Sequence, residues 1–271
     1  LSSRYEERES TQLFYRIMDT FFGKKKVDLI LQPKLEFTNE QQEIVESVIR
    51  RLIDGEPVQY IDNTAFFCYE SFYVDASVLI PRPETEELVQ WILENHYDEA
   101  IKILDVGTGS GIIPVCLAKS RPSWTVMACD ISNEALIVSR RNAREILTQG
   151  DVAFYKEDIL NPSTDYQNSL DILISNPPYV LESDKKEMED TVLQHEPHLA
   201  LFVEDKDPLQ FYSALVSYAR KNLKLGGYIY FEIHEDYKSE IIRLLEGSGF
   251  KSVVIRKDLQ AKNRMVSAVM D

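Results

Sequence analysis

The sequence predicts a doubly wound α/β domain, in which helices cover both faces of a mostly parallel sheet, preceded by a smaller helical domain. From about residue 100 onward, short apolar runs alternate with amphipathic stretches, which is the pattern of successive strand and helix units. The last two apolar runs have no helix between them, which indicates an antiparallel hairpin at the sheet edge. The first 57 residues instead carry apolar side chains at helical spacing.

The N-terminal region is predicted to contain at least two amphipathic helices. One apolar stripe runs through residues 13–22. A second helix is expected after Thr38, because residues 38–41 (TNEQ) have the form of a capping box, and Gly55 with Pro57 would end it. Together these helices predict a small bundle over residues 1–57.

The composition changes after this bundle. Residues 58–79 are rich in aromatic and β-branched side chains, which favours a β-hairpin that links two domains. A new helix is predicted to begin at Pro83, because proline suits the first turn and the acidic residues that follow complement the positive helix end.

The larger domain, residues 80–271, supplies the alternating elements. Strands are expected at residues 101–106, 125–129, 152–155, 171–175, 228–233, 251–256 and 265–270, and helices at 112–119, 134–147, 209–223 and 238–246.

Composition narrows the class of function. The chain has 271 residues and a formal net charge of −15, which disfavours a sequence-independent grip on nucleic-acid phosphates. No window approaches the roughly 18 continuous apolar residues of a membrane span. The three cysteines show no CxxC spacing, and the polar, acidic start LSSRYEERES lacks the features of a secretory signal. We therefore expect a cytoplasmic protein without nucleic-acid or membrane partners. A monomer is expected as well, although the sequence does not show the oligomeric state.

A glycine-rich loop follows the first expected strand of the larger domain. The stretch Asp105–Gly111 reads DVGTGSG, and Asp130 ends the next strand about twenty residues later. Glycines let the backbone turn tightly and approach a ligand closely, and an acid at the second strand end can accept hydrogen bonds from ribose hydroxyls. This order predicts a nucleoside-bearing cofactor.

The spacing of the glycines favours one cofactor. A dinucleotide site would need its third glycine at position 112, which is Ile112. The observed GxGxG form suits S-adenosylmethionine, which lacks a pyrophosphate. Asp158 is placed to meet the adenine amino group, and Ile159 could pack on the adenine face.

A second motif, SNPPYV, follows the fourth expected strand at residues 175–180. The Asn176 carboxamide and the Pro177 carbonyl offer two acceptors for the protons of an NH2 group. The Tyr179 ring can stack on a planar amide or base. We refer to Asn176, Pro177 and Tyr179 as the amide clamp. A simple strand stop is the structural alternative, because proline cannot donate to a strand ladder.

The motif His195-Glu196-Pro197-His198 superficially suggests a metal pair. The intervening proline disrupts a helical ligand face, and no third ligand cluster is evident. No metal site is expected.

Several motifs taken together resemble one family. They are GEPVQYI (55–61), LIPRPETEELV (79–89), ILDVGTGSG (103–111), SNPPYV (175–180) and EPHLAL (196–201). In this order they are similar to protein glutamine N5-methyltransferases of the HemK/PrmC type, from about Gly55 to the C-terminus. NPPY alone is shared with adenine N6-methyltransferases of DNA and with some RNA methyltransferases. IPRPETE joined to NPPY is much more specific.

The resemblance implies a Rossmann-like class I S-adenosylmethionine-dependent methyltransferase domain at 80–271, a substrate-recognition domain at 1–57 and a hairpin linker at 58–79. It implies methyl transfer to the glutamine of the Gly-Gly-Gln motif of peptide chain release factors. A ribosomal-protein glutamine methyltransferase, a nucleic-acid adenine N6-methyltransferase and a non-catalytic cofactor-binding module stay open.

The resemblance also assigns roles to residues. The implied catalytic residues are Asn176, Pro177 and Tyr179; the cofactor residues are Gly107, Thr108, Gly109, Ser110, Gly111, Asp130, Asp158, Ile159 and Asn176; the substrate residues are Asn176, Pro177, Pro178, Tyr179, Arg82 and Glu84. For Arg82 and Glu84, helix-start structure is an equal alternative. The chain departs from the family pattern at His234, where a glycine is usual, and at Asn263, where an acid is usual.

Overall fold

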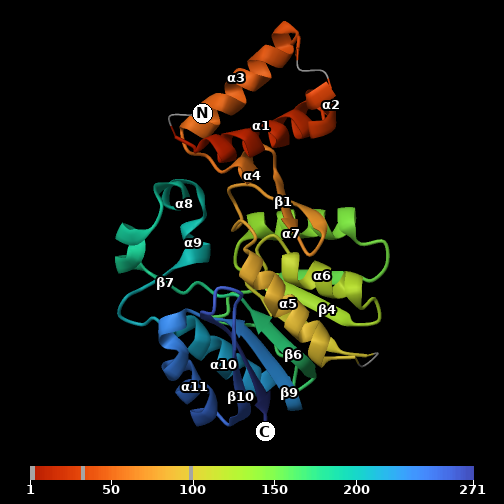
Figure 1. The fold of residues 1–271 in the computed structure, drawn as a ribbon. Helices are drawn as coiled ribbons and strands as arrows, with labels where there is room; N and C mark the ends of the chain where they lie inside the picture. The colour runs from red at the N-terminus through yellow and green to blue at the C-terminus, as the bar shows by residue number, and fades with distance from the viewer. Residues whose placement is uncertain (1–3, 32–33, 98–99) are drawn as a thin grey trace. The chain divides into compact units, whose positions relative to one another are not determined.

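The computed structural model divides into two compact units, and each is described by itself (Figure 1). The smaller unit runs to Thr64 and includes Glu189–His195; the larger comprises Ala65–Met188 and Glu196–Asp271. The residues that the structure describes are 4–31, 34–97 and 100–271. The functional borders expected at residues 57 and 79 stay a prediction.

The smaller unit is helical. Its helices are α1 (Glu7–Phe22), α2 (Lys26–Leu31), α3 (Asn39–Ile53), α4 (Val58–Ile61) and α8 (Asp190–His195). Leu13 and Ile17 of α1 pack against Val48 and Leu52 of α3 in its core. The expected capping box is confirmed, because Gln41 N donates to Thr38 Oγ1 at 3.3 Å and Thr38 N donates to Gln41 Oε1 at 3.1 Å.

The aromatic stretch after this bundle forms a hairpin, but a shorter one than expected. Its strands are β1 (Thr64–Phe67) and β2 (Glu70–Tyr73), whereas Val58–Ile61 is a helical turn. The two turn residues, Cys68 and Tyr69, have φ of 48° and 66°. Two positive φ values in a two-residue connection suit the twist of a hairpin.

The larger unit is built on a seven-stranded sheet with the order β10-β11-β9-β6-β3-β4-β5. The strands are β3 (Lys102–Val106), β4 (Thr125–Asp130), β5 (Val152–Lys156), β6 (Leu170–Ser175), β9 (Leu223–Glu232), β10 (Phe250–Lys257) and β11 (Asn263–Met270). Pairings among β3, β4, β5, β6 and β9 are parallel, whereas β11 is antiparallel to both β9 and β10. The predicted parallel sheet with a terminal antiparallel hairpin is confirmed. Of the two hairpin strands, β10 is an edge strand, whereas β11 lies inside the sheet.

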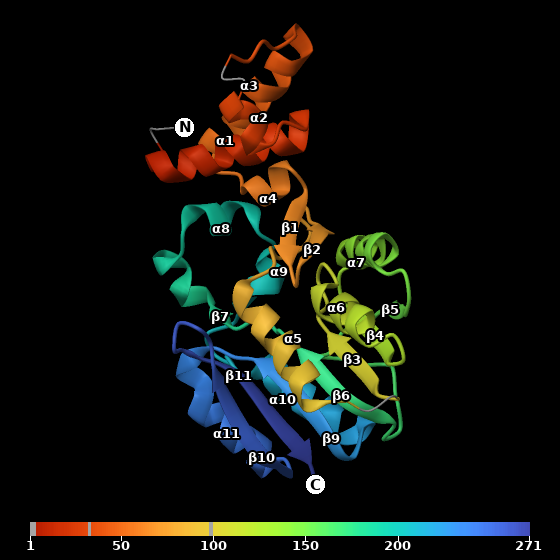
Figure 2. The same cartoon turned by 45° about the vertical axis from the view of Figure 1, so that its right-hand side comes forward.

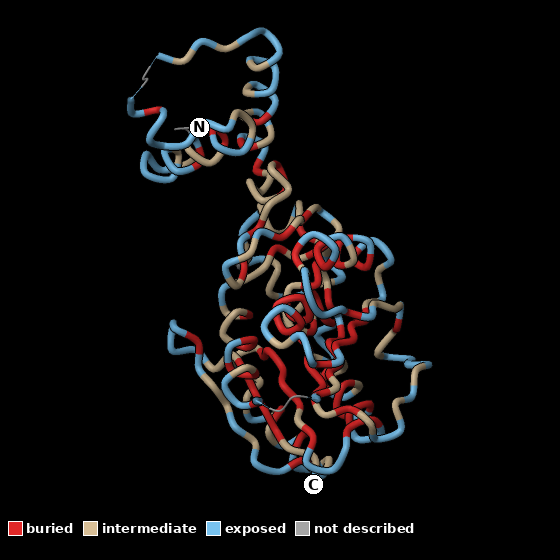
Figure 3. Tube along the Cα trace, turned by 90° about the vertical axis from the view of Figure 1, so that its right-hand side faces the viewer, coloured by how far each residue is buried: buried red, intermediate tan, exposed pale blue. Residues whose placement is uncertain are grey.

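Helices cover both faces of this sheet (Figures 1 and 2). They are α5 (Pro83–Asn95), α6 (Ile112–Ser120), α7 (Asn133–Ile146), α10 (Gln210–Asn222) and α11 (Lys238–Gly247). Ile103 and Ile172 pack with α5, α6 and α7 in one core, whereas their strand neighbours Leu104 and Leu173 pack with α10 and α11 in the other. Successive strand residues point to opposite faces, so each helix layer has its own core. Figure 3 shows buried residues concentrated in the interior of the larger unit.

The order of the strands places a crevice beside β3. The chain leaves β3 for β4 and β5 on one side and then returns to β6 on the other. Val106 and Ser175, which end β3 and β6, are register partners, and Ser175 Oγ donates to Val106 O at 2.7 Å. The loops that follow these strands therefore start side by side at the topological switch point, where ligands bind in open α/β sheets.

The segment between β6 and α10 was not resolved into elements from the sequence. In the larger unit it contains β7 (Val180–Leu181), a 3₁₀ helix (Glu182–Glu187), α9 (His198–Leu201) and β8 (Phe202–Val203). Strands β7 and β8 pair in parallel. None of the helices within the described ranges has the length and apolar character that a bilayer span requires.

Candidate active site

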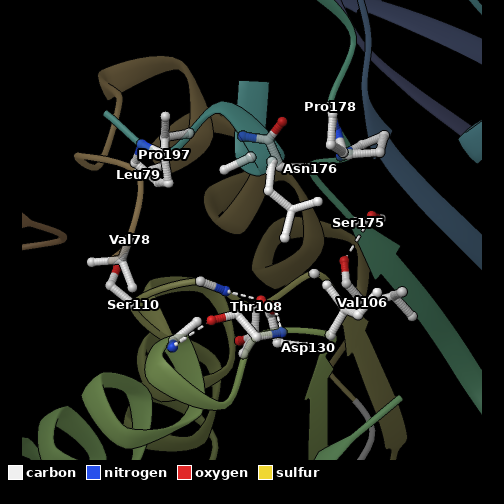
Figure 4. A pocket seen from close by; sticks show the side chains of 18 of the residues that line it. Val78, Leu79, Val106, Thr108, Ser110, Asp130, Ser175, Asn176, Pro178 and Pro197 are labelled. Carbon is white, nitrogen blue, oxygen red and sulfur yellow. Dashed lines mark hydrogen bonds between the residues drawn. The ribbon is translucent and has the colours of Figure 1, made fainter. Parts of the chain in front are cut away.

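A cavity in the larger unit lies beyond the carboxyl ends of β3, β4 and β6. Its lining comes mainly from residues 77–82, 106–110, 130–132, 157–160 and 175–178. In Figure 4, Val78, Leu79 and Pro197 lie on one side of the cavity, Asn176 and Pro178 on another, and Thr108 and Asp130 below. The cavity thus joins both sequence motifs at the crevice that the fold creates.

The glycine loop takes backbone conformations that side chains disfavour. Gly107 and Gly109 have φ of +75° and +54°, and a Cβ atom at either would meet nothing within 4 Å. Gly111 has φ of +81°, and a Cβ there would lie 2.9 Å from Ser139 Cβ. The first two glycines keep the loop open toward the cavity, whereas the third lets α6 and α7 approach each other.

Asp130 anchors this loop. Its Oδ2 accepts a hydrogen bond from Gly109 N at 2.8 Å, and its Oδ1 accepts one from Ser132 N at 2.9 Å. Burial raises the pKa of the Asp130 carboxyl above its ordinary value. A carboxylate has about four lone-pair sites, so acceptor capacity remains toward the cavity.

Asp158 and Ile159 also line the cavity, as the sequence analysis expected of cofactor residues. Asp158 already stabilises its own turn, because its Oδ1 accepts from Leu160 N at 2.9 Å and its Oδ2 accepts from Asn161 Nδ2 at 3.0 Å. Ile131, Ile159 and Leu160 add apolar surface around the two carboxylates. Acceptors beside apolar side chains and an open glycine loop fit a nucleoside-bearing cofactor.

The amide clamp is only partly in the cavity lining. Asn176, Pro177 and Pro178 line it, whereas Tyr179 does not. Asn176 Nδ2 donates to Thr85 Oγ1 at 3.3 Å, and the Tyr179 hydroxyl donates to Glu232 Oε1 at 2.9 Å. Burial is the main cause that raises the pKa of Tyr179, and the Glu232 charge adds to it.

Arg82 lines the cavity and Glu84 does not. Arg82 Nη2 donates to Glu196 Oε1 at 2.6 Å, and Ile80 N donates to Glu196 Oε2 at 3.3 Å. Arg82 thereby ties the segment before α5 to the segment before α9. Arg82 is the N-cap residue of α5 but makes no capping hydrogen bond with its side chain, so the two alternatives for Arg82 stay predictions.

Four acidic or hydroxyl residues near the cavity were not among the site residues expected from the sequence. They are Thr85, Glu157, Glu196 and Glu232, which are all buried. Only Glu196 carried a signal, as part of the EPHLAL stretch. Thr85 and Glu232 depend on partners far along the chain, because Thr85 Oγ1 donates to Glu232 Oε2 at 2.8 Å across a separation of 147 residues. Glu157 instead accepts hydrogen bonds from Ser163 N and Thr164 N, which are close to it in the sequence.

Asp105, at the start of the glycine motif, is a buried acid without hydrogen-bond partners. Its side chain is 1% exposed, and neither carboxyl oxygen has a partner among the described residues. Burial is the main cause that raises the pKa of Asp105 to about 7, and the negative charge of Asp130 adds to it.

The two departures from the family pattern have structural roles. His234 Nδ1 accepts from Asp236 N at 3.3 Å, and its ring lies 6.0 Å from the Tyr179 ring. Asn263 begins β11 and is the register partner of Lys257. His234 thus contacts a member of the amide clamp, whereas Asn263 belongs to the pairing of β11 with β10.

The two histidines of the HEPH motif belong to different elements. His195 ends α8 and His198 begins α9. Within the part of the chain that the structure describes, no group of three or more His, Cys, Asp or Glu side chains is arranged to hold a metal ion.

Comparisons with known proteins identify the family of the chain. Residues 1–61 match the family described as PrmC N-terminal domain, and residues 84–200 match Methyltransferase small domain. The chain is 42% identical to the release factor glutamine methyltransferase of Flavobacterium psychrophilum over 270 residues, which cover 98% of this chain and 94% of that one. It is 41% identical to the protein of the same name from Bacteroides thetaiotaomicron, over 99% and 95% of the two chains.

A solved structure supports the fold alone. The hMettl16 catalytic domain, crystallised in complex with an RNA hairpin, superposes with a TM-score of 0.56 at 14% identity, over 74% of this chain and 75% of that one. Together with the Methyltransferase small domain match, it confirms the predicted Rossmann-like methyltransferase fold. The resemblance found in the sequence motifs is confirmed by the relatives and the two family matches. With two relatives above 40% identity along almost the whole chain, this protein belongs to the release factor glutamine methyltransferase family.

Proposed function

We propose that this protein transfers a methyl group from S-adenosylmethionine to the side-chain amide nitrogen of the glutamine in the Gly-Gly-Gln loop of peptide chain release factors. Membership of the family supports the reaction class. The single observation that carries the proposal is the register pairing of Val106 with Ser175, because the glycine loop and the segment Asn176-Pro177 then follow paired strand ends and line one cavity. Such a cavity can hold a cofactor and a substrate amide together.

The cofactor would be held by residues on the β3, β4 and β5 side of the cavity. The Gly107–Gly111 loop would face its methionine part, and Asp130 would accept hydrogen bonds from the ribose hydroxyls. Asp158 would accept from the adenine amino group, and Ile159 would pack on the ring. Bound S-adenosylmethionine supplies a methyl group on an electrophilic sulfonium.

The amide clamp would prepare the nucleophile. An amide nitrogen is a weak nucleophile because its lone pair is delocalised into the carbonyl. The Asn176 side-chain oxygen and the Pro177 carbonyl would accept hydrogen bonds from the two N–H groups of the substrate amide. These bonds would orient the nitrogen and stabilise the positive charge that develops on it. No general base is needed, because the methylated nitrogen is acidic enough to lose a proton afterwards.

Tyr179 is the third member of the clamp, although it does not line the cavity in this structure. Its hydroxyl donates to Glu232, and its ring would stack on the planar substrate amide. Arg82 would support the substrate-facing segment through Glu196, and Glu84 lies outside the cavity lining, so its contribution to substrate binding would be indirect.

The smaller helical unit would recognise the body of the release factor, which makes this factor the expected partner. The formal charge of −15 supports a protein partner over nucleic acid, because phosphate binding needs excess positive charge. We expect the enzyme to act as a monomer in the cytoplasm.

The test is methylation of an intact, unmethylated release factor by the purified protein and S-adenosylmethionine. Mass spectrometry of the Gly-Gly-Gln peptide is expected to show the gain of one methylene mass on the glutamine. A release factor with glutamate in that position should stay unmodified. The Asn176→Ala variant should keep cofactor binding largely intact, by calorimetry, and lose roughly 100-fold or more in rate.

Two outcomes would contradict parts of the proposal. An Asn176→Ala variant with the wild-type rate would remove the amide clamp from the mechanism. Cofactor binding without methylation of the release factor would leave the fold intact and redirect the search to ribosomal proteins and nucleic acids.

A further inference from the structure

We propose that Thr85 and Glu232 are positioning residues that decide which end of the Asn176 carboxamide faces the substrate. The proposal rests on the proposed function in one respect, namely that Asn176 must present its oxygen to the substrate NH2 group. The oxygen and nitrogen ends of an asparagine amide have nearly the same shape. Packing alone therefore does not select between them, and a hydrogen-bond partner of fixed direction must do so.

A continuous chain of hydrogen bonds leads from Asn176 into the interior of the larger unit. Asn176 Nδ2 donates to Thr85 Oγ1 at 3.3 Å, and Thr85 Oγ1 donates to Glu232 Oε2 at 2.8 Å. The other oxygen of Glu232 accepts from the Tyr179 hydroxyl at 2.9 Å. Thr85 lies in the first turns of α5, Glu232 ends β9, and Asn176 and Tyr179 follow β6. We call Asn176, Thr85 and Glu232 the amide relay.

The relay has a direction because a hydroxyl group has a single proton. An ionised carboxylate only accepts hydrogen bonds, so the Thr85 hydroxyl must use its single proton to donate to Glu232. The Thr85 oxygen can then only accept, and the group that faces it must be a donor. Asn176 satisfies this with its NH2 end, which leaves its carbonyl oxygen for the cavity. The reversed amide would set two acceptors against each other.

Burial makes the direction strict. Thr85 and Glu232 are each 1% exposed, so water cannot replace either partner. A buried polar group without a hydrogen-bond partner is strongly disfavoured. The reversed Asn176 amide is therefore destabilised, because it would leave the Thr85 oxygen without a donor. Thr85 itself reaches the cavity lining and Glu232 does not. The buried carboxylate of Glu232 therefore fixes the orientation of the Asn176 amide at the cavity wall through Thr85.

Two charged residues and one hydroxyl group influence the ionisation of Glu232. Arg264 of β11 favours its ionised form, whereas Glu84 of α5 disfavours it, and the Tyr179 hydroxyl stabilises the charge by hydrogen bonding. Burial raises the pKa of Glu232 above the ordinary glutamate value. The relay is complete when Glu232 is ionised, and a rising pH favours that form, so the kinetic test is run at alkaline pH.

The kinetic test compares four variants. Thr85→Val keeps the shape and removes the hydroxyl, Thr85→Ser keeps the hydroxyl, and Glu232→Gln replaces the pure acceptor by an amide. Tyr212→Phe is the matched control, because the Tyr212 hydroxyl donates to the backbone oxygen of the same Glu232 at 3.0 Å without touching its carboxylate. Transfer to the release factor is measured with saturating S-adenosylmethionine, and cofactor affinity by calorimetry.

Thr85→Val and Glu232→Gln are expected to lower kcat roughly 10- to 100-fold, as loss of support for a reacting group does. Cofactor affinity should change by less than about 2-fold, and Thr85→Ser should recover most of the rate. Tyr212→Phe should keep the wild-type kcat. A wild-type kcat in Thr85→Val, or an equal loss in Tyr212→Phe, would overturn the proposal.

A second measurement does not need the substrate. With ¹⁵N-labelled asparagine, the side-chain NH2 signals of Asn176 are assigned by their absence in Asn176→Ala. They should shift in Thr85→Val and Glu232→Gln and stay in place in Tyr212→Phe. Unchanged signals in Thr85→Val would refute the relay even if the protein methylates the release factor. Shifted signals without methylation by the wild type would uphold the relay and refute the proposed substrate.

Discussion

The ion pair of Arg82 and Glu196 joins two cavity-lining segments that lie 114 residues apart. Replacing either residue breaks the same contact but leaves a different group behind. The Glu196 side chain is 2% exposed, whereas the Arg82 side chain is 35% exposed. The two single variants should therefore differ in stability, and the direction of that difference follows from burial.

Arg82→Ala leaves a buried carboxylate that keeps only the hydrogen bond from Ile80 N. An unpaired buried charge typically costs about 3–5 kcal/mol, and the partial exposure of Arg82 reduces this to about 2 kcal/mol. Glu196→Gln leaves an acceptor for Ile80 N and a guanidinium that already reaches water, so the expected cost is about 1 kcal/mol. Arg82→Ala should be the less stable variant.

Urea unfolding followed by tryptophan fluorescence measures this difference. Both tryptophans of the chain, Trp91 and Trp124, are buried in the larger unit, so the signal reports that unit. Lys206→Ala, which breaks an exposed pair with Glu204, is the control and should leave the unfolding midpoint unchanged. If Glu196→Gln destabilises as much as Arg82→Ala, or more, the argument from burial is wrong.

Two further predictions concern the glycine loop. Burial raises the pKa of Asp105 from 3.8 to about 7, so between these values the folded protein holds a proton that the unfolded chain has lost. The free energy of unfolding should therefore fall by roughly 4 kcal/mol as pH rises through this window. Urea titrations at several pH values should show that Asp105→Asn removes this dependence on pH. An unchanged dependence in the variant would show that Asp105 is not its cause. Gly111→Ala should cost roughly 2–4 kcal/mol, from positive φ and the contact with Ser139, in thermal or urea unfolding. Gly226→Ala has a similar φ of +78° and no close neighbour, so an equal loss there would contradict the role of the contact.

The sequence was most informative where local pattern and final structure agree. The helix Asn133–Ile146 was expected one residue later at each end, and the strand Thr125–Asp130 one residue shorter. Such elements have a strong period, and strand ends at a parallel sheet place their loops at one edge whatever the detailed packing. The glycine loop, Asp130 and Asn176 could therefore be assigned to one site without coordinates.

The sequence was least informative where an element is short or a contact is distant. Val58–Ile61 has strand-like residues but forms a helical turn after Pro57, since four residues are too few for periodicity to decide. The amide relay had no local signal at all. Thr85 is indistinguishable from any residue in the first turns of a helix until β9 brings Glu232 to 2.8 Å from it. Only the three-dimensional arrangement gives that hydroxyl a direction.

The position of β11 in the sheet determines how the larger unit can fold and what a C-terminal truncation would remove. Among the described strands, β10 pairs only with β11, and β11 also pairs with β9. The strand that comes later in the chain thus has to enter between two that precede it. Until it does, β9 is an open edge that can recruit other chains, and β10 has no sheet to join. A truncation before Asn263 would therefore detach two strands rather than one and would expose the strand that carries Glu232.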